Sequence, residues 1–231
     1  MFCHHCGAQV DAGSQFCRSC GKPLAGPPGP SAAAPLPPWT PPARVHASAG
    51  HWLGAGWNLV MADLGTYVLL ALLFFVLGTV PLIGGALIAG FHIYTMKKLT
   101  GRNPDIGDFF KGFNFFIATL VASILIGLFT FLGTLALIIP GLVIAAMYKF
   151  TYLFIVDKRM DFWQAMQASH AVVRQDYFGF TMFLILAFLV NVLGFCCLLV
   201  GLLVTVPMTF AAVTIAYKEL VGFETRTLDS L

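Results

Sequence analysis

Long uncharged stretches alternate with short charged segments along most of this chain. No Asp, Glu, Lys or Arg occurs in residues 64–96, 112–148 or 177–217. A charge at the centre of a bilayer costs roughly 3 kcal/mol, whereas a water-soluble domain needs charges on its surface. The pattern therefore predicts an integral membrane protein.

Each uncharged stretch is too long for one membrane span and suits a pair. The stretches hold 33, 37 and 41 residues, and one span needs about 20. Gly and Pro cluster near each centre, at residues 78–85, 133–141 and 194–201. The predicted fold is an all-α polytopic membrane protein with about six transmembrane helices arranged as three hairpins. The first stretch is short for two spans, and one kinked helix is the alternative.

The basic residues predict the orientation of these spans. With six spans and a cytosolic N-terminus, both termini lie in the cytosol and the outer turns carry no charge. If one kinked helix replaced the first hairpin, Lys97, Lys98 and Arg102 would face outward, against the positive-inside rule. The inner (plasma) membrane is the expected location, and we expect no secretory signal peptide, because no basic segment followed by an apolar one opens the chain. The basic residues that face the cytosol in this arrangement, as the positive-inside rule requires, are Lys97, Lys98, Arg102, Lys111, Lys158, Arg159, Arg174, Lys218 and Arg226.

Two segments between the stretches are predicted to be amphipathic helices. Asp161 is placed as an N-cap, with Gln164 three residues later, and apolar residues follow at helical spacing. Residues 52–61 show a similar pattern. Each helix either lies on the membrane surface or packs on neighbouring spans.

Four cysteines near the N-terminus form a metal-ligand pattern, Cys-x2-Cys-x10-Cys-x2-Cys, with a glycine after each pair. Two residues between thiolates let both reach one tetrahedral ion. A segment this small cannot build a core, so bound metal would supply its folding energy. The pattern predicts a structural zinc ribbon, with Zn²⁺ held by Cys3, Cys6, Cys17 and Cys20.

Two disulfides or a redox pair are the alternatives to zinc, and a reducing cytosol disfavours disulfides. Four thiolates leave no open coordination position for catalysis. We therefore interpret His4 and His5, inside the first pair, as loop residues.

The composition divides the chain into four parts. We predict a zinc ribbon in residues 1–24, a Pro/Ala-rich linker in 25–48, a six-helix transmembrane domain in 49–221 and a cytosolic tail in 222–231. Nine prolines between Pro23 and Pro42 favour an extended spacer. The run from Pro35 to Pro38 also fits a ligand of proline-reading domains.

Three polar residues inside the predicted spans form a possible intramembrane site. Lys149 is the sharpest candidate of the three, because its side chain is cationic and no span contains an acidic residue that could pair with it. It either serves a function or extends to the cytosolic interface. His92 and Asn191 are interpreted as interhelical hydrogen-bonding groups. Cys196 and Cys197 are expected to be small packing residues.

The remaining residues contain no enzyme constellation. There is no Ser/His/Asp set, phosphate-binding loop or His-Glu metal motif, so we expect a protein that is not an enzyme. The net charge of +3 is too small to indicate nucleic acid.

The arrangement resembles a group of bacterial membrane proteins that join a short zinc ribbon to a six-span domain. The helical part is similar to the membrane domain attached to glycerophosphoryl diester phosphodiesterases. The resemblance implies no established activity, and the chain lacks a phosphodiesterase domain. The segments that carry it are residues 101–110, 138–141 and 161–166, and Val206–Pro207.

Three functional hypotheses follow. The first is a non-enzymatic membrane protein whose zinc ribbon docks a cytosolic or membrane protein, while its spans organise lipids or other membrane proteins. The second is a small transporter that uses the interior of the hairpins, lined by Lys149 and His92. The third, less favoured, is a membrane-embedded enzyme acting on lipids.

Overall fold

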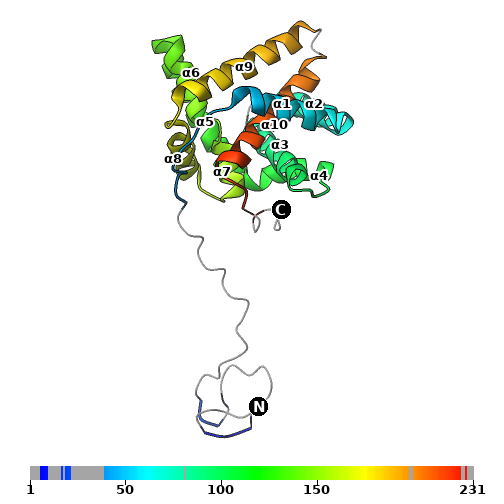
Figure 1. Ribbon diagram of the computed structural model, residues 1–231. Coiled ribbons are helices and arrows are strands. Elements are labelled where there is room, and N and C mark those ends of the chain that lie inside the picture. The colour runs from blue at the N-terminus through cyan, green and yellow to red at the C-terminus, as the bar shows by residue number, and fades with distance from the viewer. Residues whose placement is uncertain are drawn as a thin grey trace. The chain divides into compact units, whose positions relative to one another are not determined.

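The chain forms two compact units, residues 1–40 and 41–231 (Figure 1). The computed structural model describes residues 6–9, 17, 19–21, 39–80, 82–197, 200–224 and 227. Most of the predicted linker lies outside the described residues, and residues 39–48 are not helical.

The second unit is built from helices, and none of its described residues lies in a β-strand. Apolar side chains dominate these segments, and helices satisfy the backbone hydrogen bonds within each segment, as an apolar environment requires. The helices are α1 (Ala49–Met61), α2 (Leu64–Leu77), α3 (Gly84–Leu99), α4 (Ile106–Phe110), the 3₁₀ turn η1 (Lys111–Phe115), α5 (Phe116–Ala136), α6 (Ile138–Met147), α7 (Thr151–Asp157), α8 (Phe162–Val173), α9 (Tyr177–Cys196) and α10 (Leu202–Leu220).

Four helical segments of the described chain are long and apolar enough to cross a membrane. They are Ile106–Ala136, Ile138–Asp157, Tyr177–Cys196 and Leu202–Leu220. A fifth is possible if α1 and α2, bent by 102° at their junction, form one broken span. These lengths are compatible with a membrane protein, but six full spans are not confirmed.

The structure differs from the six-span prediction in the first predicted hairpin. Helices α2 and α3 contain 14 and 16 residues, about 21 and 24 Å at about 1.5 Å per residue. Both are shorter than a hydrocarbon core of about 30 Å. The other two hairpins are present as α5 with α6 and α9 with α10, each reversing within its predicted glycine-containing turn.

Paired glycines allow these two reversals. A Cβ atom on Gly141 would lie 2.8 Å from Thr134 Cα, and one on Gly201 would lie 2.5 Å from the Gly194 carbonyl oxygen. Side chains at these positions would push the two helices apart, which explains why the sequence has glycine at both turns.

Helix α3 lies inside the bundle, whereas α5 presents apolar side chains outward. Most residues of α3 are buried, including Phe91, His92 and Tyr94. On α5, by contrast, Ile117 and Leu135 are 75% and 74% exposed. An apolar surface of this extent needs a cover, and a bilayer would provide one.

Helix α1 packs along α10 rather than standing apart (Figure 1). Gly56 brings the two backbones together, because a Cβ there would lie 2.7 Å from the Met208 carbonyl oxygen. The Trp52 indole N–H donates to Glu219 Oε2 at 2.7 Å, and its ring contacts Phe180 and Phe183 of α9. Of the two interpretations of residues 52–61, the structure favours packing on neighbouring helices.

Helix α8 also packs inward while it stabilises a break between α6 and α7. Its predicted cap is confirmed, since the Gln164 amide donates to Asp161 Oδ1 at 2.8 Å. At the break, the buried Ser169 hydroxyl donates to the Met147 carbonyl at 2.7 Å and accepts the Phe150 amide at 3.1 Å. Interrupted backbone is tolerated away from water only when such partners exist.

We expect Gly56→Leu to destabilise the helical unit by about 1–3 kcal/mol, because the added side chain must displace α10. Thermal unfolding of the purified protein in detergent measures the change. Gly54→Leu is the matched control on the same helix, since a Cβ at Gly54 meets nothing within 4 Å. Equal melting temperatures for the two variants would contradict close α1–α10 packing.

Candidate functional site

Three of the four predicted zinc ligands lie together in the first unit. The sulfurs of Cys6, Cys17 and Cys20 are all within 4.8 Å of one another, and the Cys6 and Cys17 sulfurs are 3.6 Å apart. A tetrahedral zinc site with bonds of about 2.3 Å places its sulfurs about 3.8 Å apart, whereas a disulfide needs about 2.0 Å. The spacing therefore fits a shared metal ion. Cys3, His4 and His5 lie outside the described residues.

Local backbone geometry prepares the second cysteine pair for metal. The amide groups of Cys20 and Ser19 hydrogen-bond to the Cys17 sulfur and lower the pKa of this thiol to about 6. A metal ligand must be a thiolate, so a lowered pKa favours binding near neutral pH. Gly7 and Gly21 have φ of 71° and 69°, a left-handed conformation suited to glycine. The predicted tight turns are thus present.

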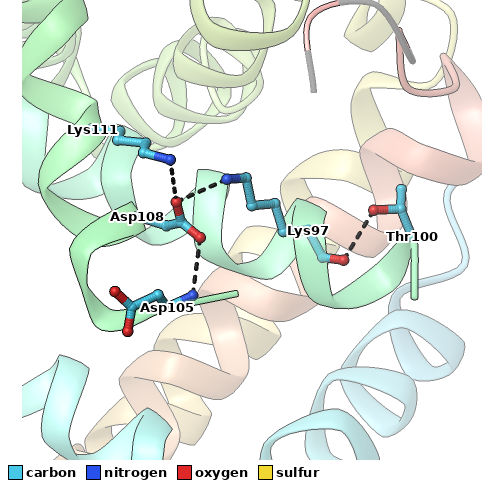
Figure 2. A network of polar contacts seen from close by, with 5 residues as sticks. All are labelled: Lys97, Thr100, Asp105, Asp108 and Lys111. Atoms are coloured by element: carbon cyan, nitrogen blue, oxygen red, sulfur yellow. Dashed lines mark hydrogen bonds and ion pairs between the residues drawn. The ribbon is translucent and has the colours of Figure 1, made fainter. Parts of the chain in front are cut away.

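Charged groups from several helix ends of the helical unit lie close together at what we call the charged end (Asp63, Lys97, Lys98, Asp108, Lys111, Asp157, Lys158, Lys218 and Glu219). Lys97 of α3 forms an ion pair of 2.8 Å with Asp108 Oδ1 of α4, and Lys111 contacts the same oxygen at 2.6 Å (Figure 2). The other oxygen, Oδ2, accepts the Asp105 amide at 3.0 Å and closes a capping box around α4.

This network accounts for the compact conformation of residues 101–110. Gly101 has φ of 73°, and the Thr100 hydroxyl donates to the Lys97 carbonyl at 2.9 Å. A Cβ on Gly90 would overlap the Phe109 carbonyl oxygen, so α3 and α4 touch through their backbones. The segment is thus a tight, charge-paired connection, and its residues need no catalytic role to explain them.

Further contacts tie the ends of other helices to the charged end. Lys98 of α3 bonds to Asp63, at the α1–α2 junction, at 2.6 Å. Asp157, at the end of α7, is fully buried and accepts the Tyr217 hydroxyl of α10 at 3.0 Å. Lys218 donates to the Leu99 carbonyl at 3.1 Å. The C-terminal ends of α3, α7 and α10 therefore meet.

The start of α9 is fixed in a similar way. Asp176 accepts the Ala47 amide at 3.0 Å and the Gly179 amide at 2.9 Å. The Ala47 amide first, with help from Gly179 and His46, holds the pKa of the Asp176 carboxyl below its usual value against partial desolvation. The carboxylate thus caps α9 and ties it to the segment before α1.

Two of the three predicted intramembrane polar residues share one cavity. His92 of α3 and Lys149, in the break between α6 and α7, line a space of about 150 Å³ together with Tyr148 and Tyr152. Asn191 is elsewhere: its amide donates to the Ala187 carbonyl at 2.8 Å and to Thr209 Oγ1 of α10 at 3.3 Å. His92 and Asn191 both make interhelical hydrogen bonds, as predicted.

Sequence reasoning missed two parts of this region. The sequence alone did not indicate that Tyr148 and Tyr152 line a cavity with Lys149 and His92. It gave Ser169 no role, and nothing in the sequence marks it as the cap of the break. Cys196 and Cys197, expected to be packing residues, are exposed at the end of α9.

The zinc-ribbon domain family matches residues 2–24 of this chain. The N-terminal segment is a zinc ribbon. Its cysteines are positioned to bind a metal ion, consistent with structural zinc. No curated protein and no solved structure matches the chain. The match ends before the helical unit, whose resemblance to a phosphodiesterase-associated membrane domain stays a prediction.

We expect the purified full-length chain to carry zinc and Cys17→Ser to lose most of it, because three thiolates hold the ion less tightly than four. Elemental analysis after gel filtration measures the zinc-to-protein ratio. His5→Ala is the control and should keep its zinc. Zinc loss from His5→Ala equal to that from Cys17→Ser would show that the ligand set is wrong.

Asp108→Ala should destabilise the helical unit by roughly 3–5 kcal/mol, because it leaves the buried Lys97 without its counter-charge. Denaturation in detergent measures the effect. Asp161→Ala, which removes only an exposed helix cap, should cost about 1 kcal/mol. Adding Lys97→Met to Asp108→Ala removes the uncompensated charge and should restore part of the stability; no restoration would contradict the assigned pairing.

Proposed function

We propose that this chain is a non-enzymatic integral membrane protein whose zinc ribbon serves as a docking module for a protein partner. The helical unit anchors the module and organises lipids or other membrane proteins around it. Both termini lie in the cytosol, and the inner (plasma) membrane is the proposed location.

The division of the chain into two compact units is the observation that carries this proposal. The ribbon belongs to a compact unit that ends at Thr40, and the apolar helices form another. A zinc site completed by four thiolates has no open position for a substrate, so its metal supports a folded surface rather than chemistry. A small stable surface on a unit of its own is suited to recognition.

The charged end supports the proposed orientation. The helix ends that meet there carry Lys97, Lys98, Lys158 and Lys218, whereas the three predicted outer turns have no charged residue. The positive-inside rule assigns the lysine-rich end to the cytosol. The six-span arrangement belongs to this proposal, with α2 and α3 as two short spans.

The charge-pairing pattern supports the non-enzymatic part. Asp63, Asp108, Asp157 and Asp176 are engaged by lysines, hydroxyls or backbone amides. Among the described residues, the ribbon cysteines are the one group of three or more His, Cys, Asp or Glu side chains placed to share a metal ion. A metal-dependent lipid hydrolase would need such a group in the helical unit.

A small transporter is the second candidate, because Lys149 and His92 line one cavity within the helical unit. Transport requires first that this cavity bind a ligand.

The docking function is tested by crosslinking in intact cells, followed by purification of the full-length chain and mass spectrometry. The wild type, Cys17→Ser and His5→Ala are compared. A docking partner should be recovered with the wild type and with His5→Ala but not with Cys17→Ser, because only the cysteine change unfolds the ribbon.

Membrane fractions must contain equal amounts of all three chains, so that loss of capture is not loss of insertion. The partner is then purified and titrated against the full chain in lipid nanodiscs, where a zinc chelator should abolish binding. Identical partners from the wild type and Cys17→Ser would exclude the ribbon as the docking module.

A further inference from the structure

The cavity beside the α6–α7 break is lined by both apolar and polar side chains. Ile88, Ile126 and Phe210 supply apolar lining, and His92, Tyr148 and Lys149 supply polar groups. Its volume is about 150 Å³, below the roughly 300–1,000 Å³ of pockets that enclose a drug-sized ligand. This room suits the head of an amphiphile and its first carbons rather than a complete acyl chain.

Lys149 is the polar group that needs an explanation. Within the described residues its ammonium forms no hydrogen bond and no ion pair, although the chain pairs its other partly buried lysines, such as Lys97 and Lys98, with aspartates. The backbone of the break is not the partner, because Ser169 already satisfies Met147 and Phe150. A lysine inside an apolar bundle is costly without a counter-charge, so a bound anion would complete the site.

One ring nitrogen of His92 is already engaged by a neighbouring helix. The Thr214 hydroxyl lies 2.9 Å from the Phe210 carbonyl oxygen and 2.8 Å from His92 Nδ1. Because Nδ1 is engaged by Thr214, Nε2 is the ring nitrogen left for a ligand. The Ser123 hydroxyl likewise contacts both the Thr119 carbonyl oxygen at 2.7 Å and the Tyr152 hydroxyl at 3.0 Å.

The cavity lining thus combines the Lys149 ammonium, a cationic donor, with the polar side chains of His92 and Tyr148. Charged donors recognise the oxygens of an anion, and His92 Nε2 can form a hydrogen bond with the same head. The apolar lining favours an alkyl substituent next to the charge.

We propose that this cavity binds the oxyanion head, carboxylate or phosphate, of a single-chain amphiphile, with Lys149 as its counter-charge. The alkyl chain leaves the cavity along apolar helix faces. The site uses the same cavity as the transport candidate, and the test measures ligand binding alone, without transport. The site does not involve the ribbon, so the binding proposal stands even if the docking proposal fails.

The test uses the zinc-loaded full-length chain in detergent micelles and isothermal titration with four single-chain probes of equal chain length. Palmitate and hexadecyl phosphate should bind, whereas hexadecanol and hexadecyltrimethylammonium should not, because they lack the negative head. Inorganic phosphate, the free form of one head, should bind at least about tenfold more weakly, since it has no alkyl chain to bury.

Three variants define the site. Lys149→Ala should weaken binding of both anionic probes at least about tenfold, and Lys149→Arg should retain it. Ala145→Leu keeps the charge but fills part of the cavity, so it should also weaken binding. Arg174→Ala removes an exposed cation away from the cavity and is the charge-matched control, and Cys17→Ser should bind as the wild type does.

Unchanged affinity in Lys149→Ala, equal binding of hexadecanol, or equal binding of inorganic phosphate would each overturn the proposal. All variants are first compared with the wild type by melting temperature and gel filtration. If Lys149→Ala fails this comparison, Lys149→Arg and Ala145→Leu decide: the proposal requires retained binding in the first and weakened binding in the second.

Discussion

An unpaired charge is expensive in an apolar environment, and this constraint accounts for most of the helical unit. The cost of several kcal/mol keeps acidic and basic residues out of three long stretches and confines them to the connections and helix ends, many of them at the charged end. There, each aspartate or glutamate of the network meets a lysine, a hydroxyl, an indole N–H or a backbone amide. These contacts hold the helix ends together in addition to apolar packing.

Two places in the helical unit leave polar groups in apolar surroundings without the usual pairing. The break between α6 and α7 exposes backbone groups, and one serine from α8 satisfies both a carbonyl and an amide. Lys149, within the same break, has no protein counter-charge among the described residues. Because the first departure is compensated by the fold and the second is not, the second points to a ligand.

The zinc ribbon is stabilised by a different interaction. Too small to bury a core, it relies on metal coordination, and its local geometry prepares for this with glycine turns and amides directed at Cys17. The two units therefore depend on unrelated interactions. Zinc loss should unfold the first and leave the second, which is why Cys17→Ser separates docking from every property of the helices.

The sequence by itself determined the helical class, the apolar stretches, two of the three hairpin turns and the zinc-ribbon pattern. These features depend on local spacing: four cysteines at short intervals, glycines at the turns, and charges confined to the connections. It also indicated Lys149 and His92 as unusual residues within apolar surroundings. What it did not determine was which of these residues meet.

Only the tertiary structure showed that α1 packs on α10 through Gly56, that α3 is buried and short, and that Ser169 caps a helix break 22 residues away in sequence. It also brought His92 and Lys149 to one cavity and placed Asn191 elsewhere. The physical reason is that burial and pairing are properties of non-local contacts. A sequence pattern states which groups need partners, and the packing of helices far apart in sequence decides which partners they find.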